Sequence, residues 1–328
     1  MANTPSPYRS ILVPLDGSKL AAEALPLAAR IARSSGAKLR LALVHQHPSI
    51  AVDITVGKTM TNVDLAARKA ERAYLRGIQS RLREEGTRVA SAVTLTGPVC
   101  PALVTYVREL GIDLVVMATH GHGGLRRAWL GSVADYLVHH LRVPILLVRP
   151  ASAHRAGVPP TEVLVPLDGS PLAEEALGPA VDLARAWDAG VSLLQIVGPV
   201  LLSTEPAFPV PSAYDGELTN MARDAAQDYL DDVVERLREE GVRATGAAVI
   251  GWNTADAILE AARPERVVLL AAATHGRGGL QRLMLGSVAD KLIRGADVPV
   301  LVHRPAGPVE HKARRARPRR VPRAKARS

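Results

Sequence analysis

The sequence predicts two tandem α/β domains, each a doubly wound, parallel sheet of five strands with helices on both faces. Three observations support this prediction. Four sequence blocks recur in the same order, apolar runs alternate with helix-like stretches, and the apolar runs contain few polar residues. Nearly continuous apolar strands are typical of parallel sheets that are buried on both faces.

The repeat has the length of a whole domain. The blocks at residues 11–18, 119–125, 130–135 and 143–149 return at residues 163–170, 274–280, 285–290 and 298–304. The offset is 152 residues for the first block and 155 for the other three, so order and spacing are both kept. We therefore expect one domain over residues 8–150, a second over 161–305, and a separate tail over 306–328.

The elements of each copy follow from this pattern. In the first copy we expect strands at 10–15, 39–45, 88–95, 113–118 and 144–148, and helices near 19–35, 60–85, 99–110 and 131–141. In the second copy we expect strands near 162–167, 191–197, 243–250, 266–271 and 299–303. Ser18 and Ser170 are expected to cap the first helix of each copy, and Gly36 to end one. Right-handed crossovers then leave only a few doubly wound topologies.

The formal net charge of +9 is concentrated at one end of the chain. Residues 311–328 contain nine Lys or Arg and no acidic residue, so the first 310 residues are neutral overall. With almost nothing apolar to bury, this tail is expected to be disordered. It could hold nucleic-acid phosphates without reading sequence, or it could be only a solvated terminus.

Several classes of protein are disfavoured by composition. No apolar run approaches about 18 residues, so no transmembrane helix or membrane association is expected. Residues 1–10 lack a secretion signal, and the single cysteine, Cys100, fits a reducing compartment. We therefore expect a cytoplasmic protein.

Three elements follow strand ends, where open α/β sheets bind their ligands. In the first copy they contain Pro14, Leu15, Asp16, Gly17 and Ser18, then Ala118, His120, Gly121 and Gly123, then Gly131 and Ser132. In the second copy they contain Pro166, Leu167, Asp168, Gly169 and Ser170, then Ala273, His275, Gly276 and Gly278, then Gly286 and Ser287. Glycines let backbone N–H groups approach a polyphosphate, and a helix N-terminus favours the anion. The same residues could also form only strand-to-helix turns and helix caps.

Other nucleotide and catalytic motifs are absent. The sequence has no P-loop, no Gly-x-Ser-x-Gly elbow and no Cys/His cluster with zinc spacing. Arg126 stands where a dinucleotide-binding fingerprint would need a third small residue. No positioned base is evident, so catalysis is not expected beyond a slow ATPase or phosphotransfer activity at His120 and His275.

These motifs resemble the universal stress protein family. Its ATP-binding members carry Gly-x2-Gly-x9-Gly-Ser/Thr, and here Gly121 and Gly276 are each followed, after nine residues, by Gly-Ser. The family's first motif glycine is replaced by Ala118 and Ala273. The resemblance implies a Rossmann-like fold of the adenine nucleotide alpha hydrolase type, with strand order 3-2-1-4-5. It also implies that the two copies pair through their last strands as an internal pseudo-dimer, which could pair again as a homodimer.

The resemblance further implies ATP as the ligand, with Mg²⁺ as a candidate companion ion. The implied contacts add Val44, Met117, Val133, Val197, Ala272 and Val288 to the residues given above. The leading hypothesis is a stress-response regulator that presents a nucleotide-dependent surface to regulatory protein partners. A slow ATP hydrolase and a nucleic-acid-associated protein acting through its tail are the alternatives.

Overall fold

The computed structural model describes residues 8–46, 57–119, 130–149, 161–202, 213–263, 266–274 and 285–304. The first copy contains β1 (Ser10–Leu15), α1 (Lys19–Ala22), α2 (Leu25–Ser35), β2 (Lys38–His45), α3 (Gly57–Glu84), β3 (Val89–Thr96), α4 (Val99–Glu109), β4 (Leu114–Ala118), α5 (Ser132–His140) and β5 (Ile145–Val148). The second contains β6 (Glu162–Pro166), α6 (Pro171–Glu174), α7 (Leu177–Trp187), β7 (Gly190–Val197), β8 (Val200–Leu202), β9 (Ala213–Asp215), α8 (Gly216–Glu239), β10 (Ala244–Ile250), α9 (Thr254–Ala261), β11 (Val267–Ala273), α10 (Ser287–Gly295) and β12 (Val300–His303). The α/β repeat expected from the sequence is therefore present.

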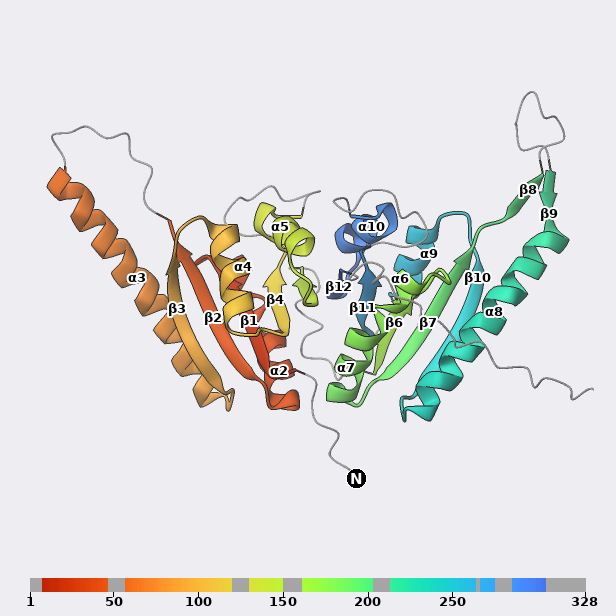
Figure 1. The fold of residues 1–328 in the computed structure, drawn as a ribbon, viewed down its shortest axis with the longest axis horizontal. Coiled ribbons are helices and arrows are strands. Elements are labelled where there is room, and N and C mark those ends of the chain that lie inside the picture. The colour runs from red at the N-terminus through yellow and green to blue at the C-terminus, as the bar shows by residue number, and fades with distance from the viewer. Residues whose placement is uncertain are drawn as a thin grey trace, which may run out of the picture.

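Ten strands form one continuous sheet in the order β10-β7-β6-β11-β12-β5-β4-β1-β2-β3 (Figure 1). Within each copy every neighbouring pair is parallel, and the order is third, second, first, fourth, fifth. The copies meet where β5 and β12 run antiparallel, with Leu146 opposite Leu301. The last strands thus pair, as the family resemblance implies.

Helices cover both faces of this sheet, and the core runs through the seam between the copies. One buried cluster joins the sheet to α2, α3, α7 and α8, and the other joins it to α4, α5, α9 and α10. Leu146 and Leu301 belong to the first cluster, Leu147 and Val300 to the second. Below the seam, the Tyr8 hydroxyl donates to the carbonyl of Pro179 (3.1 Å). The two copies therefore share one apolar interior.

Two local features differ from the sequence-based expectation. The helix expected over 19–35 is divided into α1 and α2, with Pro26 in the first turn of α2, and the second copy has the same division between α6 and α7. The hairpin of β8 and β9 was not predicted, since each strand has only three residues, which is too few to show an alternation of apolar and polar residues.

Candidate functional site

The candidate site lies at the carboxyl ends of β1 and β4, which are neighbours in the sheet. Chain connections leave these two strands in opposite directions, toward β2 on one side and β5 on the other. The carboxyl ends of β6 and β11 make the equivalent edge in the second copy. Both edges lie at the top of Figure 1, on either side of the seam. This is the position at which doubly wound sheets hold ligands.

After β1, the motif residues form a tight turn that starts α1. Asp16 Oδ1 accepts hydrogen bonds from the Ser18 N–H (2.9 Å) and the Ser18 hydroxyl (2.6 Å). Ser18 Oγ in turn accepts the Ala21 N–H (3.0 Å), which caps the helix. Gly17 has φ +83°, a value that side-chain-bearing residues rarely adopt. The turn therefore needs Asp, Gly and Ser for structural reasons.

The second copy repeats this turn closely. Asp168 Oδ1 accepts the Ser170 N–H (2.9 Å), Ser170 Oγ accepts the Ala173 N–H (3.2 Å), and Gly169 has φ +76°. Leu15 and Leu167 are buried beside these turns, and Pro14 and Pro166 occupy equivalent strand positions. The motif thus forms a strand-to-helix turn, which is the purely structural interpretation that the sequence left open. The turn also lies at the sheet edge where a ligand could bind.

The start of α5 is attached to the end of β4 and lacks a side-chain cap. Gly131 donates its N–H to the carbonyl of Thr119 (2.8 Å), and Thr119 donates to the carbonyl of Val148 (3.0 Å). With glycine at the N-cap, no side chain among the described residues caps the first turn of α5. Ser132 is exposed and Val133 half-buried at that end. The helix therefore directs uncapped N–H groups toward the candidate site.

The same arrangement occurs at α10. Gly286 donates to the carbonyl of Thr274 (2.8 Å), and Thr274 donates to that of His303 (2.9 Å). Within the part of the chain that the structure describes, no side chain caps the helix. Ser287 and Val288 are exposed there. The opposite end of α10 is held by the first copy, because the Arg149 guanidinium donates to the carbonyls of Arg294 and Ala296, the latter at 3.1 Å. A residue that follows β5 thus positions a helix of the second candidate site.

The apolar floor of the site differs between copies. Val44 and Met117 are buried against α4 and α5, and Ala272 replaces Met117 in the second copy. Pro14 pairs with Ala42, whereas Pro166 pairs with Leu194. The register therefore makes Ile196 the counterpart of Val44, and Val197 the counterpart of His45. This shift of one residue in the alignment matters because neighbouring side chains of a strand point to opposite faces of the sheet.

Several predicted residues lie outside the described part of the chain. They are His120, Gly121 and Gly123 in the first copy and His275, Gly276 and Gly278 in the second. Ala118 and Ala273, which replace the family's glycine, end β4 and β11 directly before those segments. The described residues therefore provide the turn, the helix start and the floor of each site.

A buried histidine that the sequence analysis did not select lies beside the first site. The side chain of His45 ends β2 with no solvent exposure, and its Nδ1 and Nε2 face Glu71 (2.9 Å) and Asp64 (2.7 Å) of α3. Arg68 Nε donates to the other oxygen of Asp64 (2.9 Å). Hydrogen bonding, first to Glu71 and then to Asp64, raises the pKa of His45 despite its burial. The spacing of Asp64, Arg68 and Glu71 along one helix face was a signal that could have indicated this cluster.

The described residues offer no metal centre and no membrane-spanning element. No group of three or more His, Cys, Asp or Glu side chains among them could hold a metal ion. No helix within the described ranges is long and apolar enough to cross a bilayer.

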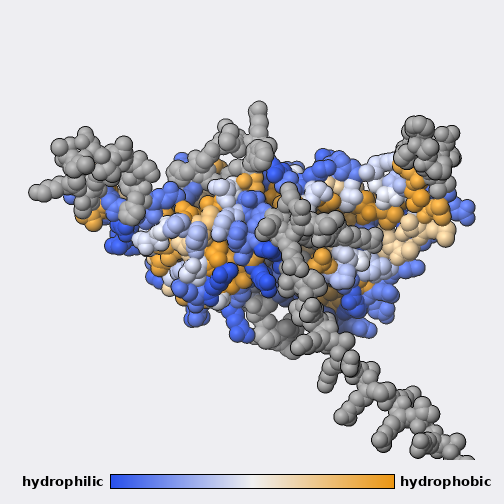
Figure 2. All heavy atoms as spheres, turned by 45° about the horizontal axis from the view of Figure 1, so that its top comes forward, coloured by the Kyte–Doolittle hydropathy of each residue, from blue (hydrophilic) through white to orange (hydrophobic). Residues whose placement is uncertain are grey.

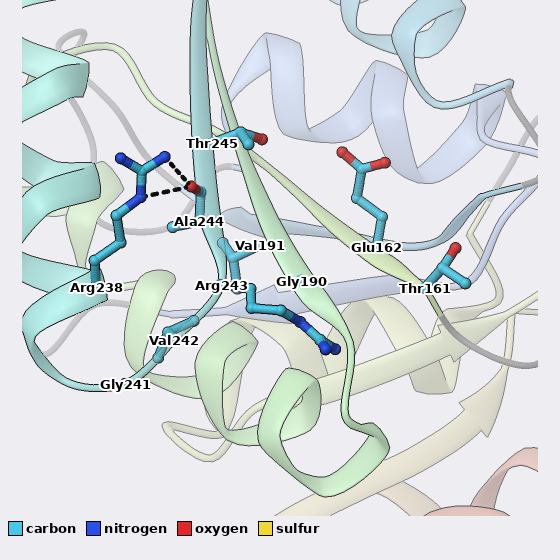
Figure 3. Close-up of a pocket in the computed structure, with 10 residues that line it drawn as sticks. All are labelled: Thr161, Glu162, Gly190, Val191, Arg238, Gly241, Val242, Arg243, Ala244 and Thr245. Atoms are coloured by element: carbon cyan, nitrogen blue, oxygen red, sulfur yellow. Dashed lines mark hydrogen bonds between the residues drawn. The ribbon is translucent and has the colours of Figure 1, made fainter.

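A separate hollow of about 610 Å³ lies at the amino ends of β6, β7 and β10, away from the candidate site (Figure 3). Its Arg238 donates to the carbonyl of Ala244 (2.8 Å), and its Arg243 pairs with Asp188 (3.1 Å). Glu162 on its rim pairs with Arg266 (2.7 Å). These charges already have partners, so the hollow does not indicate a class of ligand.

Comparison with known proteins agrees with this architecture. The family model described as "Universal stress protein family" matches residues 7–149 and again 161–304. A universal stress protein of Mycobacterium tuberculosis is 27% identical over 317 residues, covering 90% of this chain and 94% of the relative. The crystal structure of a universal stress protein from Archaeoglobus fulgidus has a TM-score of 0.65 at 17% identity, covering 90% of this chain and 98% of that one.

A solved universal stress protein in complex with cAMP is similar to a single copy, at 24% identity and a TM-score of 0.33, covering 43% of this chain and 97% of that one. The two family matches together span most of the sequence. The chain belongs to the universal stress protein family and contains two tandem domains of that family.

Proposed function

We propose that each copy binds an adenine nucleotide, with ATP as the principal ligand, and that the protein acts as a regulator through binding rather than catalysis. The observation that carries the proposal is the uncapped start of α5 and α10 beside the switch point of each sheet. A polyphosphate there would accept N–H groups for which the described ranges contain no side-chain acceptor, and it would lie at the positive end of the helix dipole.

The remaining groups have compatible roles. The Ser132 and Ser287 hydroxyls are exposed at the helix starts and would donate to phosphate oxygens. Asp16 and Asp168 lie on the neighbouring strand ends, where a carboxylate suits ribose hydroxyls or an adenine amino group. The turn of each copy keeps this carboxylate at the site edge. Mg²⁺ would reach the protein with the nucleotide.

The test is titration calorimetry of the full chain with ATP, ADP, AMP and cAMP in the presence of Mg²⁺. We expect two ATP sites per chain. Gly131→Asp and Gly286→Asp should each weaken one site, and the double variant both, because a carboxylate at the N-cap accepts the N–H groups and repels phosphate. Loss of charge-assisted hydrogen bonds should weaken the altered site by about tenfold or more.

The substitution separates binding from folding. Gly131 and Gly286 have φ near −58°, which any residue can adopt, and aspartate is a favourable N-cap. The variants should therefore melt no lower than the wild type. Pro98→Asp adds the same charge at the start of α4, two strands away from β1, and should leave ATP binding unchanged. An absence of heat with all four nucleotides, or unchanged binding in the double variant, would contradict the proposal.

A further inference from the structure

The two outermost helices of the molecule occupy equivalent positions but have opposite charge. α3 flanks the edge strand β3, and α8 flanks the opposite edge strand β10 (Figure 1). The sequence of α3 contains seven Lys or Arg and three Asp or Glu, whereas that of α8 contains three and seven. Each molecule thus has one basic end and one acidic end.

Shared contacts establish which positions of α3 and α8 correspond. Arg83 donates to the carbonyl of Val89 at the start of β3 (3.1 Å), and Arg238 donates to that of Ala244 at the start of β10 (2.8 Å). The helices therefore correspond at an offset of 155 residues, as in the later sequence blocks. The buried faces agree under this offset, with Leu75 and Leu82 matching Leu230 and Leu237. The sign of the charge differs between α3 and α8 only on their outward faces.

The outward face of α3 is a continuous basic stripe. Lys69, Arg72 and Arg76 are all exposed, and their spacing of three and four residues places them on one side of the helix. None of the three forms an ion pair within the described part of the chain. Leu65, which is 58% exposed, precedes them on the same side. We call Leu65, Lys69, Arg72 and Arg76 the α3 stripe.

The outward face of α8 has the complementary pattern. Asp224, Asp228 and Asp231 are exposed with the same kind of spacing, and Met221, which is 60% exposed, precedes them. Asp224 and Asp231 occupy the positions that correspond to Lys69 and Arg76. Hydrophobic residues also gather at this end of the molecule, near β8, β9 and the start of α8 (Figure 2). We call Met221, Asp224, Asp228 and Asp231 the α8 stripe.

We propose that the α3 stripe of one molecule docks on the α8 stripe of a second copy of this chain. Opposite charges at matched helical spacing would attract, and the exposed Leu65 and Met221 would remove each other from water at the helix starts. The two stripes lie at opposite ends of the sheet, so the contact is head-to-tail and leaves one stripe of each kind unfilled in any open chain of molecules. The seam between β5 and β12 takes no part, because both strands are already paired.

The cationic tail is the other conceivable occupant of the acidic α8 stripe, since residues 311–328 contain nine Lys or Arg. A second copy accounts for more of the structure. It explains the unpaired basic stripe on α3, the helical spacings of three and four residues in both stripes, and the apolar residue at the same end of each. A tail bound to α8 would explain only the acidic stripe.

Sedimentation velocity of the full chain tests the proposal. Wild-type protein should self-associate at about 0.01 M salt, where the Debye length is about 30 Å, and dissociate at about 1 M salt, where it is about 3 Å. Reversing the α3 stripe (Lys69→Glu, Arg72→Glu and Arg76→Glu) should raise the dissociation constant at least about tenfold at low salt. Reversing the α8 stripe (Asp224→Lys, Asp228→Lys and Asp231→Lys) should do the same.

The decisive measurements restore complementarity. An equimolar mixture of the two reversed proteins should associate, because the acidic ends of one protein then meet the basic ends of the other. The chain carrying both reversals should also associate with itself, which shows that it is folded. A monomeric wild type at low salt, or association that survives reversal of a single stripe, would overturn the proposal. Loss of association on removing residues 306–328 would identify the tail, not a second copy, as the occupant.

Discussion

The two copies connect the end of their second strand to their long helix by different chemistry. In the first copy, His45 at the end of β2 lies between Asp64 and Glu71 of α3. In the second copy, Val197 holds the corresponding position, and the following Val200 N–H donates to the hydroxyl of Thr219 in α8 (2.9 Å). The same junction therefore depends on histidine–carboxylate contacts in one copy and on a backbone-to-hydroxyl hydrogen bond in the other. The two copies thus share a backbone fold at this junction but differ in its electrostatics.

The largest expected effect concerns the seam, which the copies share. Leu146 and Leu301 are buried, with at most 1% exposure, and lie opposite each other across the antiparallel pair. Leu146→Ala and Leu301→Ala should each lower the free energy of unfolding by about 2–5 kcal/mol, by similar amounts. The double variant should be non-additive by about 0.5 kcal/mol or more, because the two side chains share one core.

Urea denaturation measures these differences. Leu110→Ala, at a side chain that is 38% exposed, serves as the control and should cost no more than about 0.5 kcal/mol. Strictly additive losses, or a large cost at only one of the two leucines, would show that the seam is not one packed unit.

The next effect is specific to the first copy. Two carboxylates favour the imidazolium form of His45, so its folded pKa is raised above the unfolded value of about 6.5. Its stabilisation is therefore complete below about pH 6.5 and is lost as the pH rises through the folded pKa. At pH 6, His45→Val should lower the free energy of unfolding by about 1.5–3 kcal/mol.

Chemical denaturation at pH 6 and pH 9 measures this dependence. The difference between wild type and His45→Val should shrink as the pH rises from 6 to 9 through the raised pKa of His45, since Asp64 still keeps Arg68 as a partner. Val197→Ala, the matched change in the second copy, should cost the same at both pH values. A pH-independent difference for His45→Val would mean that the cluster is not ionised as described.

The smallest effect separates two equivalent tyrosines. Tyr229 donates its hydroxyl to Glu174 (2.9 Å), which also pairs with Arg236. The buried Tyr74 hydroxyl has no hydrogen-bond partner among the described residues, because Ala22 stands where the second copy has Glu174. Tyr229→Phe should cost about 1–2 kcal/mol, whereas Tyr74→Phe should be neutral or slightly stabilising. Thermal melts of the two variants measure both changes, and equal losses would contradict the assignment.

Much of the fold was predictable because it depends on patterns that survive in a single sequence. The four repeated blocks and the apolar runs located every strand of the ten-stranded sheet to within a few residues. The division at Pro26 was missed because a proline in the first turn begins a helix as readily as it interrupts one. The hairpin of β8 and β9 depends on contacts with α8 that no short sequence window contains.

The candidate site was predictable only in part. The turns at Asp16 and Asp168 and the helix starts at Gly131 and Gly286 depend on local sequence, and the structure shows them as turns and uncapped helix starts at the expected edge. Sequence alone did not show that Val44 corresponds to Ile196, because strand register depends on hydrogen bonding between strands. The spacing of Asp64, Arg68 and Glu71 marks one face of α3, but His45 lies up to 26 residues away in the sequence, so that spacing alone did not identify the histidine as their partner.

The two copies that pair through β5 and β12 belong to one chain, and this has an evolutionary consequence. In an assembly of two identical chains, every substitution appears in both halves at once, so the halves cannot specialise separately. Here each half is encoded independently, and a change in one leaves its counterpart intact. The exchange of Lys69 for Asp224 and of His45 for Val197 shows that divergence has already reached the surface and the strand ends. One half can thus keep an ancestral task while the other acquires a different one, although both halves share a common interior.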